Sequence, residues 1–155
     1  MKYGLYKPVI VVSLLFALSG LSCETYNLDR LSDLIIENVE IVPSQVTAGN
    51  SVTVSCQVKN RGDGLADFPI LQFEGLYFFF SSDPVFQRGD DMLDTENIDD
   101  LEVGQSQEVD GISLTIPGGI SPGTYYIIFY IDYLNDIEEL NEDNNTGYIG
   151  IEVVP

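Results

Sequence analysis

Apolar and polar residues alternate with a period of two through most of the chain after residue 33, and this restricts the region to β-structure. The clearest run covers residues 51–60, where one parity is polar and the other is apolar. The apolar members are Val52, Val54, Cys56 and Val58. Because successive side chains of a strand point to opposite faces, the run predicts a strand with one buried face and one wet face. No segment of this region has the period of an amphipathic helix.

Turn signals divide the region into about seven predicted strands. Besides residues 51–60, strands are expected near 34–42, 73–80, 112–116, 124–133 and 147–154, and residues 88–100 are expected to form an acidic loop. This spacing predicts an all-β fold, an immunoglobulin-like antiparallel β-sandwich with Greek-key connections. Residues 33–155 are expected to form one domain, large enough to bury a core without disulfides.

The first 22 residues are predicted to be an export signal and not part of the fold. Lys2 and Lys7 give a basic start, and the apolar run that follows is too short to span a bilayer, which takes about 20 residues. Small residues lead to Cys23. Ordinary cleavage after Ser22 fits this pattern, and so does lipidation of Cys23, although Gly20 stands where lipoprotein signals usually have leucine. We favour lipidation, because ordinary cleavage gives no reason for a cysteine at that position.

Residues 23–32 would then be a lipid-anchored tether, and the lipid would be the chain's only contact with the membrane. The expected location is a bacterial membrane, at the outer membrane or the cell surface. The whole sequence carries a net charge of −19 and no histidine, and losing Lys2 and Lys7 makes the mature chain more acidic. Such a charge argues against a nucleic-acid partner and against electrostatic attraction to an anionic bilayer.

Cys56 has the parity of the neighbouring valines, which predicts a buried, structural side chain. A reactive thiol is the alternative. Tyr125 follows Pro122-Gly123 at the start of the penultimate predicted strand. That is the position of a tyrosine corner in immunoglobulin-like folds, and a plain core aromatic is the alternative.

Several short motifs follow one another in a fixed order between residues 33 and 153. They are Asp33-Leu34-Ile35-Ile36, Gly49-Asn50-Ser51-Val52, Val58-Lys59-Asn60-Arg61-Gly62, Phe78-Phe79-Phe80-Ser81-Ser82-Asp83, Leu101-Glu102-Val103-Gly104, Gly123-Thr124-Tyr125 and an asparagine-rich stretch ending at Asn144-Asn145. In this order they resemble the CARDB family, the cell-adhesion-related domain found in bacteria. Phe80 departs from the leucine usual there, and the approach over residues 70–75 is longer. The resemblance implies an immunoglobulin-like sandwich of an exported or surface protein, but neither an enzyme nor a ligand.

The stretch from Ile137 to Asn145 must form the tip of a hairpin, and it is more polar than a turn requires. Its asparagines Asn141, Asn144 and Asn145 are expected to be structural, bonding the long hairpin through their side chains. The sharper hypothesis is a calcium site, because calcium takes 6 to 8 oxygen ligands. Candidate ligands at this end are Asp132, Asp136, Glu139 and Glu142. A second candidate cluster contains Asp83, Asp90, Asp91 and Asp94, for which a solvated loop is the alternative.

Two aromatic strands are expected to be neighbours in one sheet, and their outward residues would then form a contiguous patch. These residues are Tyr77, Phe79, Tyr126, Ile128 and Tyr130. Such a patch marks a binding surface unless something covers it. The expected cover is the segment 64–71, with Phe68 and Ile70.

Three hypotheses for the function follow. The first is a non-catalytic envelope module that binds a protein or a glycan through the aromatic patch. The alternative is a calcium-stiffened structural spacer or assembly subunit, with calcium as the only expected cofactor. A carboxylate-dependent glycan hydrolase is the remote alternative. An enzyme is not expected, because the chain has no histidine base and no phosphate-binding loop, and its acids are too widespread for one pair to stand out.

Overall fold

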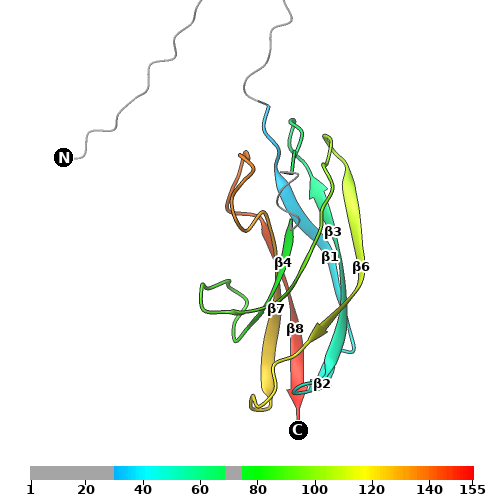
Figure 1. The fold of residues 1–155 in the computed structure, drawn as a ribbon, viewed down its shortest axis with the longest axis vertical. Helices are drawn as coiled ribbons and strands as arrows, with labels where there is room; N and C mark the ends of the chain where they lie inside the picture. The colour runs from blue at the N-terminus through cyan, green and yellow to red at the C-terminus, as the bar shows by residue number, and fades with distance from the viewer. Residues whose placement is uncertain (1–29, 69–74) are drawn as a thin grey trace, which may run out of the picture.

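The computed structural model describes residues 30–68 and 75–155, which form two packed β-sheets (Figure 1). The strands are β1 (Leu34–Val42), β2 (Gln45–Thr47), β3 (Ser51–Asn60), β4 (Leu76–Ser81), β5 (Asp91–Glu96), β6 (Ser106–Thr115), β7 (Gly123–Ile131) and β8 (Thr146–Val154). The predicted signal, Cys23 and most of the predicted tether lie outside the described residues, as does Ile70. Within the described part, no helix is long and apolar enough to cross a membrane.

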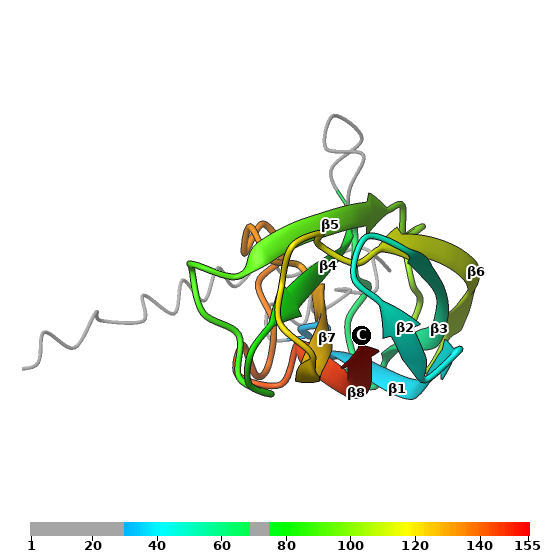
Figure 2. The ribbon, with the colours of Figure 1, turned by 90° about the horizontal axis from the view of Figure 1, so that it is seen from below.

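The two sheets have the strand orders β1-β3-β6 and β2-β8-β7-β4-β5. Figure 2, seen along the long axis, shows them as two layers. The chain crosses between the layers after β1, β2, β3, β5 and β6, and the longer crossings after β3, β5 and β6 give the connectivity of a Greek-key sandwich. The predicted all-β sandwich is therefore confirmed. The predicted pairing of the two aromatic strands is also present: β4 and β7 are antiparallel neighbours, with Phe78 opposite Phe129.

The core fills the space between the two layers with the inward residues of both sheets. Phe78 and Phe129 are fully buried and meet edge to face, with ring centroids 5.3 Å apart. Cys56 is buried with the valines of β3, and burial raises the pKa of its thiol to about 12. A thiol with such a pKa is protonated at neutral pH, so Cys56 acts as a small apolar side chain. The Tyr125 hydroxyl donates a hydrogen bond to the carbonyl oxygen of Ser121 at 3.0 Å, as in a tyrosine corner.

Two strands appear where none was predicted. β5 lies within the expected acidic loop and pairs antiparallel with β4, and only Leu93 of this strand packs against the core. β2 is three residues long and pairs parallel with the end of β8, burying Val46. Both are edge strands. Their hydrogen bonds come from a neighbouring strand, so their own residues need little apolar periodicity.

The packed structure also begins earlier than residue 33. Ser32 is buried, and the carbonyl oxygen of Leu31 accepts backbone hydrogen bonds from Asp63 at 3.1 Å and Gly64 at 3.0 Å. A Cβ atom added at Gly62 would lie 2.5 Å from that carbonyl oxygen. Glycine is therefore required at position 62, because only a residue without a side chain lets the N-terminal segment lie this close.

We expect Gly62→Ala to lower the free energy of unfolding by roughly 1 to 3 kcal/mol, because the clash is with backbone that moves only if the N-terminal segment shifts. Urea unfolding measures the effect. Gly89→Ala is the matched control, because nothing lies within 4 Å of a Cβ there. Equal stability of the two variants would contradict the close packing of the segment.

Candidate metal centre

The polar tip between β7 and β8 is built around the carboxylate of Asp132. Asp132 follows β7 directly and adopts a positive φ of 50°, which turns the chain. Its two side-chain oxygens accept backbone hydrogen bonds from Asp136 at 3.0 Å and Ile137 at 3.1 Å. Ile137 then inserts into the core. The carboxylate is thus held in place by the backbone of the loop that follows it.

Glu139 joins this tip to the first strand. One carboxylate oxygen accepts a short hydrogen bond from the backbone N–H of Leu34, and the other accepts one from the side-chain amide of Asn145 at 2.6 Å. The backbone N–H of Leu140 donates to the Ser32 carbonyl at 2.8 Å. Glu142 is fixed in turn, because its Oε1 accepts the backbone N–H of Glu139 at 2.9 Å.

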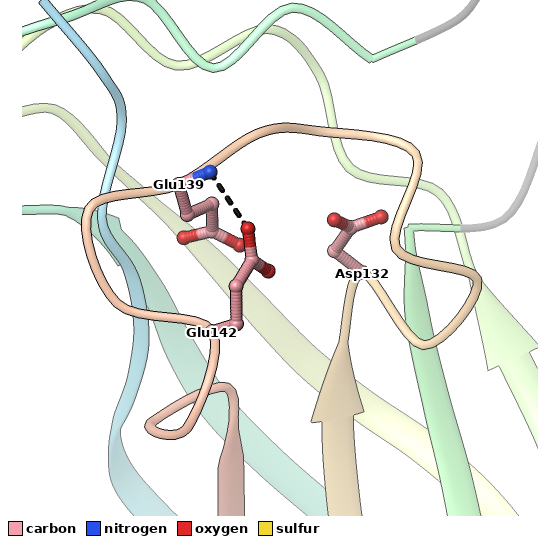
Figure 3. A group of neighbouring side chains, drawn as sticks. All are labelled: Asp132, Glu139 and Glu142. Atoms are coloured by element: carbon pink, nitrogen blue, oxygen red, sulfur yellow. Dashed lines mark hydrogen bonds between the residues drawn. The ribbon is translucent and has the colours of Figure 1, made fainter. Parts of the chain in front are cut away.

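The side chains of Asp132, Glu139 and Glu142 converge (Figure 3). Each offers a carboxylate oxygen, and the three oxygens lie within 4.8 Å of one another. Asp132 and Glu139 are 7% and 6% exposed, whereas Glu142 is exposed. The ion pairs of the described residues are Lys59 with Glu37 and Arg61 with Asp33, so no described cation balances the three acids.

Burial without a counter-charge perturbs the ionisation of this group. Desolvation raises the pKa of Glu139 from 4.5 to about 7, against the opposing hydrogen bonds from Leu34 and Asn145. Desolvation also raises the pKa of Asp132, although its two backbone hydrogen bonds lower it in part. The pKa of Tyr130 rises too, through burial and the nearby acids. Asp132, Glu139 and Glu142 therefore repel one another and are the described carboxylates that could hold a cation.

The donor set suits a hard divalent cation such as calcium, which prefers carboxylate and amide oxygens. Among the described residues, the side-chain oxygens of Ser32, Asn144 and Asn145 are buried and accept no hydrogen bond. Asn145 is bonded through its amide nitrogen to Glu139, so its unsatisfied oxygen lies on a side chain that contacts the ligand group. Such orphaned oxygens are uncommon in native proteins and fit a site that takes up an ion.

The other predicted ligands are not part of this group. Asp136 is exposed and contributes its backbone N–H, not its carboxylate. In the described residues, Asp83, Asp90, Asp91 and Asp94 do not converge on a common point with metal-ligand spacing. Asp83 and Asp90 accept hydrogen bonds from Val85 and Gln87, and Asp94 accepts one from the next residue. Asp83 and Asp90 therefore bond the backbone of the loop before β5.

The predicted asparagines bond the tip through their side chains. Asn141 accepts a hydrogen bond from the backbone N–H of Asp143 at 3.2 Å. The side-chain amide of Asn144 donates a hydrogen bond to one carboxylate oxygen of Asp33 at 2.7 Å. The other oxygen of Asp33 accepts a hydrogen bond from Nε of Arg61, also at 2.7 Å. The role of Asp33 and Leu34 in holding the tip was missed at the level of sequence, because these residues lie more than 100 positions away from it.

The predicted aromatic patch is not an open surface, which corrects that expectation. Tyr77, Phe79 and Ile128 are only 5%, 4% and 1% exposed. They form a second small core under Phe86 and Tyr133. Tyr130 packs against this core from its side, while Tyr126 is half-buried and pairs with exposed Tyr148.

The cover also differs from the predicted one. Phe68, from the segment expected to fold over the patch, packs against the main core instead. Phe86 comes from the β4–β5 connection, and Tyr133 from the tip, with rings 4.8 Å and 5.3 Å from that of Phe79. Phe86, an aromatic residue in the loop after the aromatic strand, was the available sequence signal for this cover, whereas Tyr133 was expected to end the strand 124–133.

The raised pKa of Glu139 predicts a pH-dependent stability in the absence of metal. Because the folded pKa lies above the ordinary value of 4.5, the stabilisation is complete below about pH 4.5 and is lost as pH rises through 7. We expect the free energy of unfolding to fall by about 2 to 3 kcal/mol between pH 5 and 7.5 in EDTA. Denaturant unfolding at several pH values measures it.

Glu139→Gln should flatten this slope, because the amide does not ionise. Glu138→Gln is the control: Glu138 is an exposed neighbour on the same tip, and its loss should leave the slope as it is. A flat profile in the unsubstituted protein would contradict the burial of the Glu139 charge.

Two face-to-face sheets with Greek-key crossings and a carboxylate-lined hairpin tip define an immunoglobulin-like sandwich module. The chain belongs to the CARDB family, whose family model matches residues 31–148. This family comprises non-catalytic, cell-adhesion-related modules. A search of the curated proteins gives no match.

Solved structures share the fold. The solution structure of a CARDB domain from Pyrococcus furiosus has a TM-score of 0.57 at 19% identity, covering 81% of this chain and 97% of that domain. A crystal structure of the same domain, described as a complex with di-metal ions, has a TM-score of 0.53 at 20% identity, covering 81% and 96%. β-Glucosidase 3B from Thermotoga neapolitana has a TM-score of 0.52 at 10% identity, with 80% of this chain but only 16% of the enzyme covered. These likenesses show the fold alone.

Proposed function

We propose that this protein is a non-catalytic module of the bacterial cell surface whose tip is clamped by a bound calcium ion. The observation that carries the proposal is the convergence of Asp132, Glu139 and Glu142 within 4.8 Å, with no described basic residue to balance them. An ion at this point would remove the repulsion among the three acids, which is about 1 kcal/mol per close pair in water and several times that in a partly buried site.

The clamp would stiffen the junction between the N-terminal segment and the sandwich. Glu139 receives the backbone N–H of Leu34, and Leu140 bonds to Ser32, so the ligand loop and the first strand form one unit. The structurally similar CARDB domain from Pyrococcus furiosus is described as a complex with di-metal ions, which supports the proposal that this fold can bind a metal. Calcium is favoured over magnesium here, because calcium tolerates the irregular geometry of a loop site.

We expect calcium to raise the melting temperature of the chain from Glu24 to Pro155. With a Kd of about 0.5 mM, as for weak extracellular sites, 5 mM calcium adds about 1.4 kcal/mol. That corresponds to a rise of roughly 4 to 8 °C for a domain of this size. Thermal unfolding in EDTA and then in calcium measures it.

Glu142→Gln should abolish the calcium-dependent rise, and it should raise the melting temperature in EDTA by relieving repulsion. Glu142 is exposed, so the variant keeps the packing around it. The control is again Glu138→Gln, which should retain the full calcium effect. A melting temperature that does not change at 10 mM calcium would refute the calcium clamp. This concentration is about ten times the largest dissociation constant expected of such sites.

We further propose that the module is exported and anchored through a lipid on Cys23, at the outer membrane or the cell surface, where its partner is a protein or a glycan. The basic start, the short apolar run and the cysteine after a small residue support this. Mass spectrometry of the mature protein should find N-terminal diacylated Cys23, and Cys23→Ala should release the protein from membranes. An unmodified Cys23 at the mature N-terminus would contradict the anchor.

A further inference from the structure

Aliphatic side chains are exposed at the end of the sandwich where the described chain begins. Four of the eight large apolar residues that are exposed in the described chain lie in loops at this end. These four entry-end residues are Leu65, Val103, Leu134 and Leu140, which are 46%, 52%, 52% and 54% exposed. They come from three loops, which follow β3, precede β6 and join β7 to β8. Figure 1 shows these loops together at one end and the C-terminus at the other.

Backbone hydrogen bonds join the three loops to one another through the N-terminal segment. The N–H of Leu140 donates to the carbonyl oxygen of Ser32 at 2.8 Å, and the residue before Ser32 accepts two N–H groups from residues 63–64. Ala66 and Leu101 exchange two backbone hydrogen bonds, each at 3.0 Å. The exposed aliphatic side chains of this end therefore belong to loops that are fixed side by side.

The chain that precedes the described residues joins the sandwich at this same end. Arg30, the first described residue, lies seven positions after Cys23, so the chain between them spans at most about 25 Å when fully extended. A lipid on Cys23 would therefore hold this end, and not the opposite one, close to the membrane surface. Because so short a tether keeps the lipid at a high effective concentration, weak apolar contacts suffice to dock the domain.

We propose that the four entry-end residues dock on the neutral, zwitterionic lipid surface to which Cys23 attaches the module. Leucine and valine side chains leave water when they enter the interfacial region of a bilayer, and this favours docking. A neutral surface fits because Glu138, Glu142 and Asp143 of the same end are exposed and would be repelled by anionic headgroups. The inference rests on the lipid anchor of the proposed function but not on calcium, and it adds a second membrane contact to that anchor.

The test attaches the mature chain to vesicles through Cys23 and detects lipid contact by tryptophan quenching. The chain from Cys23 to Pro155 is coupled in EDTA to phosphatidylcholine vesicles that contain a maleimide lipid, and Cys56 is buried and protected from the reaction. The sequence has no tryptophan, so Leu134→Trp gives a single emission signal. We expect brominated phosphatidylcholine to quench this emission and to leave that of Val42→Trp unchanged, because Val42 is an exposed aliphatic residue at the opposite end of β1. Equal quenching in the two variants, or none in Leu134→Trp, would overturn the proposal.

A further pair of substitutions separates docking from simple closeness to the vesicle. Leu65→Ser and Val103→Ser, added to Leu134→Trp, keep the tether and the charge but remove two aliphatic side chains from the other loops. The ratio of docked to free domain should fall about tenfold, roughly threefold for each side chain, while the melting temperature stays the same because both residues are exposed. Quenching that persists in full would show that the tether alone brings this end near the lipid, and it would overturn docking. Emission from uncoupled Leu134→Trp that shifts with protein concentration, without lipid, would assign the entry-end residues to a second copy of the chain instead.

Chemical coupling makes this test independent of the natural anchor. Mass spectrometry of the exported protein decides whether Cys23 carries a lipid, whereas the coupled chain reports only whether the entry-end residues contact lipid. Adding phosphatidylglycerol to the vesicles should weaken the quenching in EDTA, because the exposed acids of this end are repelled by the anionic headgroups. Stronger quenching on those vesicles would contradict the assignment to a neutral lipid surface.

Discussion

The hydrogen bonds to the buried carboxylate of Glu139 hold together the end of the molecule that carries the β7–β8 tip. This one side chain accepts the backbone N–H of Leu34 and the amide of Asn145, so it connects the first strand, the hairpin tip and the start of β8. Asp132 fixes the other side of the tip by accepting two backbone N–H groups. A neutral side chain at either position would hold the loop through weaker hydrogen bonds, because only a carboxylate forms charge-assisted hydrogen bonds with backbone donors.

The same arrangement stores an unfavourable interaction. Two carboxylates that are almost fully buried and a third at their edge lie together without a described cation, and desolvation raises the pKa of both buried acids. Two effects oppose each other at this tip: the hydrogen bonds favour the charged form of the Asp132 and Glu139 carboxylates, and burial disfavours it. Such a conflict is typical of sites that bind ions, since the ion removes the unfavourable part and leaves the hydrogen bonds intact.

The sequence predicted most of the sandwich because strands such as residues 51–60 alternate between apolar and polar side chains. Val52 to Val58 are buried with the expected parity, and Phe78 and Phe129 lie on the inner face, but β4 is buried on both faces. The edge strand β5 was missed because its pairing comes from β4 and not from its own composition. Asp132, Glu139 and Glu142 were among the predicted ligands, but the spacing of acids along the chain did not separate them from Asp136 or from Asp83 to Asp94. Only the loop conformation does that, through the positive φ of Asp132.

The chain enters the sandwich at the end that carries the tip and leaves it at the opposite end (Figure 1). A pulling force between the two ends therefore runs along the strands of both sheets, and it loads the transverse hydrogen bonds between β1 and β3 in shear. In that geometry many bonds share the load at once and do not open one after another. The hydrogen bonds of Ser32 and Leu34 to the tip lie at the end where this force enters, so they bear load together with the first bonds between β1 and β3.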